Sequence, residues 1–217
     1  MKTEKILSLV LFVAMLGLSA WGHFHLPDGP VPIHYGLHGE VNGTLPRDKA
    51  LIFMPVMALA MSVLFFWLLP AIMPKSVSPE RFTATYGAVM LTVIVLFAGL
   101  HVMLVLSAAG LAMDHVRVIT IGLGALFVVM GNLLPKTRLN YLMGIRTPWT
   151  ISDERVWDKT HRFAGPLFVL GGFVAMAGAF LPEASARFAV LIAAISLPAV
   201  VSIAYSYLVS RALKLTP

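Results

Sequence analysis

The chain contains no cysteine and very little charge. Only 12% of its 217 residues are charged, about half of the ~25% that is usual in a soluble domain. The absence of cysteine excludes disulfides, thiolate catalysis and cysteine metal sites. Hydrophobic residues make up 59% of the chain, and the mean hydropathy is +0.87. This composition indicates an integral membrane protein.

Six apolar runs, each near the ~20 residues that a membrane-spanning helix needs, predict six spans. They cover residues 5–22, 51–73, 86–109, 117–134, 164–181 and 187–209. Asp, Glu, Lys and Arg occur in these runs only at the ends. Proton- and sodium-driven transporters need carboxylates inside the membrane, so this class is disfavoured. We therefore predict an all-α integral membrane protein, a bundle of six transmembrane helices.

The first run also has features of a signal peptide. Lys2 and Lys5 precede an apolar stretch, and Ser19-Ala20 could precede a cleavage site. We favour a retained helix, because its loss would leave five spans and move the N-terminus outside.

Basic residues predict the orientation of the bundle. With a cytoplasmic N-terminus, four of the 16 Lys and Arg residues lie outside, namely Arg47, Lys49, Arg117 and Arg187. The other twelve lie inside, namely Lys2, Lys5, Lys75, Arg81, Lys136, Arg138, Arg146, Arg155, Lys159, Arg162, Arg211 and Lys214. The positive-inside rule therefore places both termini in the cytoplasm. The net charge of +6 is then a topology signal, with anionic lipids as natural partners and no direct nucleic-acid binding expected.

The chain divides into two membrane regions, which we expect to form one structural unit. Residues 1–85 carry an outer loop at 23–50, and residues 86–217 carry a cytoplasmic loop at 135–163. No separate soluble domain fits in what remains.

The outer loop is rich in proline, glycine and histidine. Its prolines and glycines exclude a long helix and favour an ordered, turn-rich loop with a short extended segment at Val31–Tyr35. Four histidines, His23, His25, His34 and His38, could bind zinc together with Glu40. Their spacing matches no defined zinc motif, so these are weak metal candidates and a solvent-facing or partner-binding loop is favoured.

The cytoplasmic loop gathers cations and tryptophans. Lys136, Arg138 and Arg146 could hold phosphate or carboxylate groups. Thr150 or Ser152 could cap a short helix over Asp153–Phe163, lying along the membrane interface. Trp157 and His161 would share one face of that helix, because they are four residues apart. The loop is either a positively charged region anchored by aromatic residues or a site for a lipid headgroup, a peptide or a regulator.

Two polar residues lie in or near the predicted spans. His101 is the only ionisable residue well inside a span, which makes it a functional candidate. The alternative is a neutral imidazole bonded to a serine or carbonyl of a neighbouring helix. Asn132 is better explained by capping or an interhelical hydrogen bond than by ligand binding. The small residues Gly171, Ala175 and Ala179 predict a close helix contact.

The order and spacing of one group of residues resemble the SdpI-type immunity protein family of bacterial membrane proteins. The residues that carry this resemblance are Gly131-Asn132, Pro135, Asn140, Gly144-Ile145-Arg146-Thr147-Pro148-Trp149-Thr150, Trp157, Thr160-His161 and Gly165. The outer segment Pro32-Ile33-His34-Tyr35-Gly36-Leu37-His38-Gly39-Glu40 resembles a small domain of unknown function that often precedes that signature.

The resemblance implies a function that composition alone does not reveal. Family members protect a bacterial cell from a secreted peptide toxin that collapses the proton gradient, and a cytosolic transcriptional repressor can be captured at the membrane. The protein would then lie in the bacterial inner membrane as a multi-pass protein without a cofactor. The toxin-facing residues would be Pro32, His34, Gly36, Gly39 and Glu40. The cytoplasmic motif would comprise Asn132, Pro135, Asn140, Gly144, Arg146, Thr147, Pro148, Trp149, Trp157 and His161.

The alternative is a membrane enzyme or lipid-handling protein. Arg146, Asp153 and His161 would offer an anion clamp, a carboxylate and a general base. No recognised nucleophile or metal motif organises them, so a non-enzymatic protein is favoured. A small-molecule carrier is a third option, given the uncharged spans.

Overall fold

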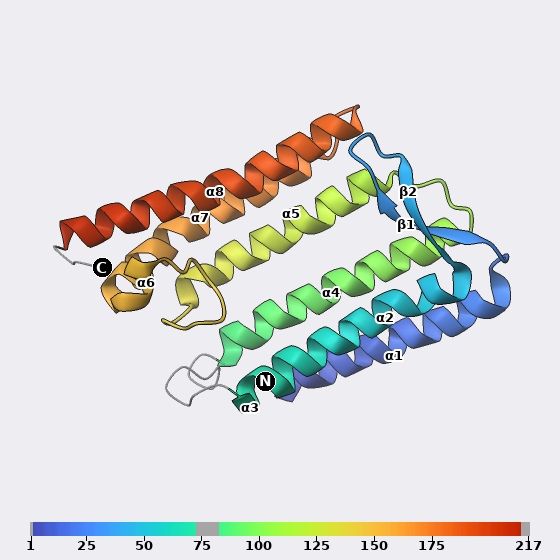
Figure 1. Cartoon of the computed structure of the whole chain (residues 1–217), viewed down its shortest axis with the longest axis horizontal. Helices are drawn as coiled ribbons and strands as arrows, with labels where there is room; N and C mark the ends of the chain where they lie inside the picture. Colours follow the sequence, from blue (N-terminus) through green and yellow to red (C-terminus); the bar gives the residue numbers. More distant parts are fainter. Residues whose placement is uncertain (1, 73–82, 214–217) are drawn as a thin grey trace.

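The computed structural model describes residues 2–72 and 83–213 and is mostly helical (Figure 1). Lys75, Arg81 and Lys214, three of the cations assigned to the inner side, lie outside the described residues. The six long helices are α1 (Lys2–His25), α2 (Arg47–Val63), α4 (Thr83–Ala108), α5 (His115–Leu133), α7 (Glu154–Gly178) and α8 (Ala184–Ala212).

Short elements connect the long helices. A two-stranded antiparallel hairpin, β1 (Pro30–Tyr35) and β2 (Val41–Pro46), joins α1 to α2. The α2 helix continues through a π-helical turn, η1 (Leu64–Leu68), into α3 (Leu69–Ile72), and the Tyr86 hydroxyl of α4 donates to the Phe65 carbonyl (2.7 Å). The turn η4 (Leu134–Lys136) and the helix α6 (Pro148–Ser152) lie between α5 and α7. The prediction of an all-α chain is therefore wrong at the hairpin.

Successive long helices run in opposite directions. The start of α1, the end of α8 and α6 lie at one end of the bundle, here called the loop end, and the hairpin lies at the other, the hairpin end (Figure 1). Both termini thus lie at the end that carries most of the cations.

Five helices are long and apolar enough to cross a membrane, which makes this a multi-pass membrane protein. They span Lys2–His25, Arg47–Ile72, Ala84–Ala108, His115–Lys136 and Ala184–Ala212. The sixth predicted span, 164–181, lies mostly on α7. That helix is about 37 Å long at ~1.5 Å per residue, but its first third is polar, so its length and composition together do not mark it as a span.

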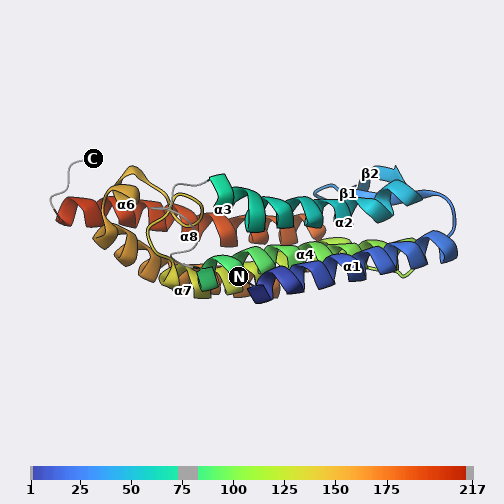
Figure 2. The same ribbon diagram turned by 90° about the horizontal axis from the view of Figure 1, so that it is seen from below.

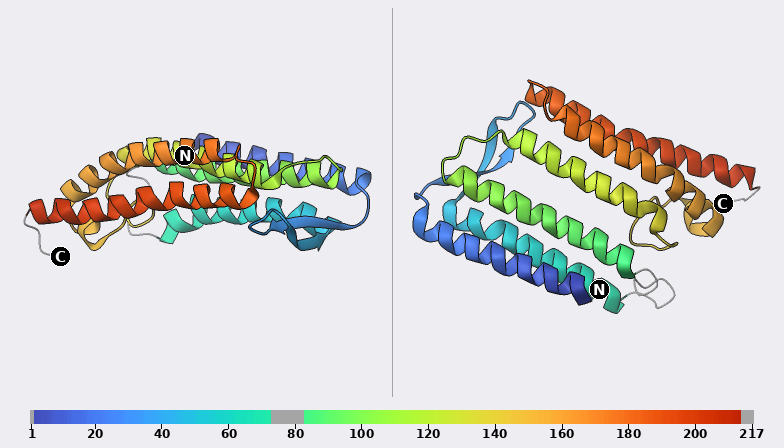
Figure 3. Two further views of the ribbon diagram at one scale, coloured as in Figure 1. Left: turned by 90° about the horizontal axis from the view of Figure 1, so that it is seen from above. Right: turned by 180° about the vertical axis from the view of Figure 1, so that it is seen from behind.

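The helices form two layers. Figures 2 and 3 show α1, α4, α5 and α7 in one layer, with α2 and α8 in the other. Within this arrangement α1, α2 and α4 pack on one another, as do α5, α7 and α8, and the two groups meet where α4 contacts α5. The hairpin lies at the end of the layer that contains α2 (Figure 2).

Glycines bring α5 and α7 into close contact. A Cβ on Gly131 would lie 2.7 Å from the Gly165 carbonyl oxygen, and one on Gly124 would lie 2.8 Å from that of Gly172. Without a side chain at these four positions the two backbones can touch, which gives the dispersion contacts that associate helices in lipid. The predicted small-residue stripe faces the other neighbour, because Gly171 packs against Ala194 of α8.

Candidate functional site

The site at the loop end is built around Trp157 and His161, which are both fully buried on the first turns of α7. Their rings stack with centroids 4.0 Å apart. The predicted separate helix over Asp153–Phe163 is wrong, because it is the first part of α7, which continues without a break into the apolar segment. The four-residue spacing still places the two rings on one face, as the pattern predicted.

Both nitrogens of His161 are occupied. Its Nδ1 donates to the Trp157 carbonyl (2.8 Å), since a carbonyl only accepts, and its Nε2 accepts the backbone N–H of Ile145 (3.0 Å). Burial lowers the pKa of His161 below its ordinary value, so the imidazole is neutral. His161 therefore holds the loop backbone and has no lone pair free to act as a general base.

Gly144 lets the loop pass directly over this histidine. Its φ of +106° lies in the region that disfavours L side chains. A Cβ there would also clash with His161 Nε2 and would lie 3.2 Å from Trp157 Cη2. Both constraints require glycine, which explains why Gly144 stands beside Ile145 in the motif.

The rest of the loop is held by hydrogen bonds to buried side chains. Asn140 is fully buried, and its Oδ1 accepts the backbone N–H groups of Leu142 (2.8 Å) and Met143 (2.9 Å). The Trp157 indole donates to the Thr137 carbonyl (3.0 Å). These bonds satisfy backbone groups that an irregular segment would otherwise leave unpaired.

Thr147 begins α6 and ties it to α8. Its Oγ1 accepts the Thr150 N–H (3.2 Å), and the Thr150 hydroxyl accepts the Thr147 N–H (2.8 Å), a reciprocal capping box. Pro148 occupies the first helical position, where no N–H is needed. Thr147 Oγ1 also lies 3.2 Å from Ser206 Oγ of α8. The prediction that Thr150 or Ser152 caps the following helix is wrong, since Thr147 caps α6 and Asp153 caps α7.

Cations surround this buried unit. Lys136, Arg138 and Arg146 are exposed, and within the described residues no carboxylate forms an ion pair with them. The Arg146 guanidinium donates to the Tyr141 carbonyl. Arg155 instead pairs with Asp153 (2.8 Å), and this hydrogen-bonded partner lowers the pKa of Asp153 to about 2.

The remaining motif residues have structural contacts. Asn132 is exposed and donates back to the Val128 carbonyl of its own helix (2.9 Å). Pro135 lies against Gly165, where a Cβ would be 2.6 Å from Pro135 Cγ. Trp149 packs edge-to-face on Tyr207 of α8, with centroids 5.1 Å apart. The structure thus brings most of the motif into one packed unit and leaves Arg146 at its surface.

The residues of the enzyme alternative do not form a catalytic group. His161 is buried with both nitrogens bonded, and the Asp153 carboxylate caps α7 and pairs with Arg155. Neither is free to exchange a proton with a substrate beside Arg146. The geometry supports a structural role for His161 and Asp153.

The hairpin carries the outer candidates. The extended segment predicted at Val31–Tyr35 is confirmed as most of β1. Its His34 is exposed, and Nδ1 bonds to Asn42 Oδ1 across the hairpin. Pro32 is half-buried and pairs with Thr44 in the ladder.

The tip of the hairpin is a tight turn. The Gly36 N–H donates to the Glu40 carbonyl (2.8 Å), and the Glu40 carboxylate accepts the His38 N–H (3.0 Å). Gly39, with a φ of +82°, lies near Val116 of α5 and Ala184 of α8. The hairpin therefore begins in the α1–α2–α4 group and reaches the other group at its tip.

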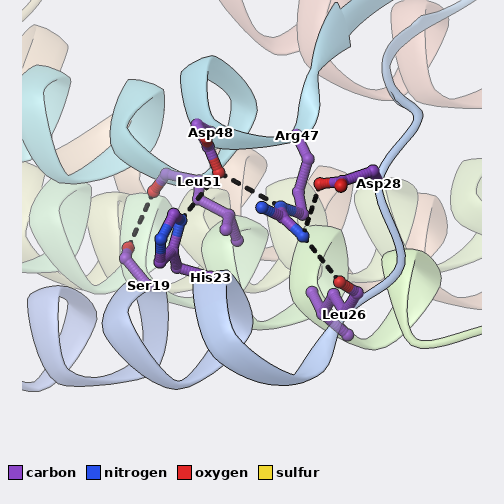
Figure 4. A network of polar contacts seen from close by, with 7 residues as sticks. All are labelled: Ser19, His23, Leu26, Asp28, Arg47, Asp48 and Leu51. Carbon is purple, nitrogen blue, oxygen red and sulfur yellow. Dashed lines mark hydrogen bonds and ion pairs between the residues drawn. The ribbon is translucent and has the colours of Figure 1, made fainter.

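The outer histidines are dispersed. His23 Nδ1 bonds to Asp48 (2.9 Å), and Arg47 pairs with Asp28 (2.8 Å) and donates to the Leu26 carbonyl (2.7 Å) (Figure 4). Among residues 2–72 and 83–213, no three histidine or acidic side chains gather as a metal site would require. The four weak metal candidates, His23, His25, His34 and His38, are therefore not brought together as ligands.

His101 joins three helices within the bundle. Its Nε2 lies 3.1 Å from both the Ser19 hydroxyl and the Met15 carbonyl of α1, and the Ser19 hydroxyl donates to the Leu51 carbonyl of α2 (2.7 Å). This is the interhelical arrangement that the sequence allowed as the alternative to a functional role.

One buried ion pair was not predicted from the sequence. Arg187, only 4% exposed, pairs with Asp114 and donates to the Leu181 (2.6 Å) and Pro182 (3.0 Å) carbonyls. Asp114 also caps α5 by accepting the Arg117 N–H (3.0 Å). An acidic residue directly before an apolar run signals such a cap, but its distant partner is not visible in the sequence.

Comparison with known proteins bears on the loop-end site. Residues 136–206 match the model of the SdpI/YfhL protein family, covering the loop, α6, α7 and most of α8. The chain carries an SdpI/YfhL family region. Residues 10–59 match a second model, a domain of unknown function (DUF1648), which covers most of α1, the hairpin and much of α2. The recognition of an SdpI-type sequence preceded by this domain is confirmed.

Two proteins of Bacillus subtilis (strain 168) are similar to this chain. The immunity protein SdpI is 25% identical over 171 residues, which are 79% of each chain. The uncharacterized protein YfhL is 33% identical over 54 residues, which are 24% of this chain and 49% of that protein. No solved structure matches the chain.

Proposed function

We propose that this protein gives a bacterium immunity to a secreted, membrane-active peptide toxin. The observation that carries the proposal is the similarity to the immunity protein SdpI, which extends over 79% of both chains. The protein would act in the cytoplasmic membrane, the inner one where there are two, with both termini and the loop end in the cytoplasm. The excess of cations at the loop end supports this orientation.

The hairpin is the surface that we assign to the toxin. It lies at the opposite end from the termini (Figure 1). His34, Leu37, His38 and Glu40 on it are exposed. Exposed apolar and ionisable groups on a rigid turn suit an amphipathic peptide. Pro32, Gly36 and Gly39 would shape this surface rather than contact the peptide through side chains.

The loop end would contact a cytosolic regulator. Arg146 is exposed above a buried unit, and the hairpin tip contacts α5 and α8 through Val116 and Ala184. The far part of α8 holds the loop through Ser206 and Thr147. A shift of the hairpin on toxin binding would therefore act on helices that also support the loop.

Survival and membrane potential of a toxin-sensitive bacterium test this proposal. The protein would be expressed with His34→Ala and Arg146→Ala, and cells challenged with the SdpI-type peptide toxin. His25→Ala and Arg162→Ala are matched controls, since His25 is exposed at the hairpin end but outside the hairpin itself, and Arg162 is exposed at the loop end.

The expected result is that wild type and controls retain their potential and that His34→Ala loses protection. Arg146→Ala should keep protection but lose any response of a cytosolic regulator. Absence of protection by the wild type at matched expression would refute the immunity function.

A further inference from the structure

An apolar cavity of about 140 Å³ lies at the loop end between α4, α5, α7 and the loop. Its walls include Val89, Phe127, Met130, Met143, Ile145 and Phe168. The hydroxyl of Thr137, which also lines it, already donates to the Leu134 carbonyl (2.7 Å), and the Ile145 N–H is bonded to His161. The lining therefore offers apolar atoms and no free polar group among these.

The apolar lining of the cavity suits an apolar group better than water, which needs polar partners. Cavities of about 150 Å³ lined by aliphatic and aromatic side chains stay dry and bind molecules such as benzene. An empty space of this kind forfeits dispersion contacts on every wall. The cavity is only partly enclosed, so a group from outside can enter it.

Three cations stand next to the cavity along the chain. Lys136 and Arg138 flank Thr137, and Arg146 follows Ile145. All three side chains are exposed, and the described part of the chain gives them no carboxylate within ion-pair distance. An apolar cavity beside uncompensated positive charge, at one end of a membrane bundle, complements a molecule with an apolar chain and an anionic head.

We propose that this cavity binds an acyl chain of an anionic phospholipid, whose headgroup is held by Lys136, Arg138 and Arg146. The membrane supplies the apolar chain, and arginine and lysine are the side chains that attract anionic headgroups. Proximity to the lipid is guaranteed for a multi-pass protein, whereas a peptide would have to reach the loop end.

The cavity is preorganised by the buried motif. His161 fixes Ile145, Asn140 fixes Met143, and the ring of Phe168 stacks on that of Phe127 with centroids 5.8 Å apart. Walls that are already ordered lose little conformational entropy on binding. The lipid site is thus a consequence of the same contacts that shape the SdpI-type loop, and it does not depend on the toxin.

Lipid binding to the full chain in mild detergent tests the proposal. Native mass spectrometry would count bound phosphatidylglycerol and phosphatidylcholine with identical chains, with glycerol 1-phosphate as a competitor that lacks chains. Val89→Phe fills the cavity and Val89→Ala enlarges it. Lys136→Gln/Arg138→Gln/Arg146→Gln removes the cations, and Lys159→Gln/Arg162→Gln/Arg211→Gln removes the same charge from exposed positions elsewhere at this end.

We expect phosphatidylglycerol to bind about tenfold more tightly than phosphatidylcholine, and this preference to disappear in the first triple variant alone. Val89→Phe should lose both lipids by about tenfold while Val89→Ala keeps them. If Val89→Phe does not fold, the two triple variants still decide the outcome.

Three results would overturn the proposal. Equal loss of the preference for phosphatidylglycerol in both triple variants would mean that surface charge in general attracts the lipid. Displacement of the lipid by glycerol 1-phosphate would mean that the site binds the anionic group alone. Unchanged lipid binding in Val89→Phe, together with lost toxin protection in cells, would assign the cavity to the peptide. Because lipid binding is measured without toxin, absence of lipid binding would not contradict the proposed immunity function. Absence of toxin protection would likewise not contradict lipid binding.

Discussion

At the scale of single residues, the histidines show how burial decides a role. His161 is 1% exposed, donates through Nδ1 to its own helix α7 and accepts through Nε2 from the loop. It therefore holds the loop against α7. His34 is exposed at the hairpin and bonds to a side chain on the neighbouring strand. Histidine thus has a structural role at the loop end and is a candidate contact residue at the hairpin end.

The neutral state of His161 predicts that acid weakens the fold. In the unfolded chain its pKa is near 6.5, while burial lowers the pKa in the folded protein. The unfolded state therefore binds more protons below about pH 6.5, so this contribution to the free energy of unfolding is complete above that pH. It falls by up to about 1.4 kcal/mol per pH unit until the pH reaches the lowered folded value.

Thermal unfolding in detergent from about pH 8 to about pH 5 measures this effect. His161→Gln offers a donor and an acceptor without titrating, so it should be less stable than the wild type at high pH but less sensitive to acid. Identical pH slopes for the two proteins would show that His161 does not control the acid sensitivity.

At the scale of elements, the contact between α5 and α7 depends on glycines that face each other. Gly124 meets Gly172 and Gly131 meets Gly165, and the two positions on each helix are seven residues apart. The contact holds the start of α7, and with it Trp157 and His161, against the end of α5. The element that carries the site is therefore positioned by residues without side chains.

We expect Gly131→Leu to lower the free energy of unfolding by about 1–3 kcal/mol or more, because the new side chain meets the backbone of α7. Gly99→Leu is the matched control, since Gly99 is exposed on α4 and has open space where a Cβ would be. Unfolding of both variants in detergent with increasing dodecyl sulfate compares them. Equal stability would mean that α5 and α7 can separate without cost.

At the scale of the whole molecule, the even number of long helices places both termini at one end and the hairpin at the other (Figure 3). Cations concentrate at the loop end. At the hairpin end, Arg47 pairs with Asp28 and Asp48, and Arg187 pairs with Asp114. The positive-inside rule counts Lys and Arg near the span ends and gives acidic residues little weight, so the excess of Lys and Arg itself favours a cytoplasmic loop end.

The orientation predicts which end reacts with a membrane-impermeant maleimide. The chain has no cysteine, so Thr44→Cys on β2 and Ser152→Cys at the end of α6, both at exposed positions, each provide one reactive site. Thr44→Cys should react in cells whose cytoplasmic membrane is intact, and Ser152→Cys only after permeabilisation. The opposite pattern would place the termini outside.

The sequence alone determined the membrane class, the approximate limits of most spans, the strand at Val31–Tyr35 and the family resemblance, because hydropathy and local motifs are properties of neighbouring residues. Only the tertiary structure decided that α7 runs without a break from the polar loop into the bundle and that His161 bonds Ile145. It also decided that Arg187 meets Asp114 and that an apolar cavity is lined by the loop that carries the cations. These features join residues far apart in the chain, and their partners are selected by how helices pack, which no local pattern specifies.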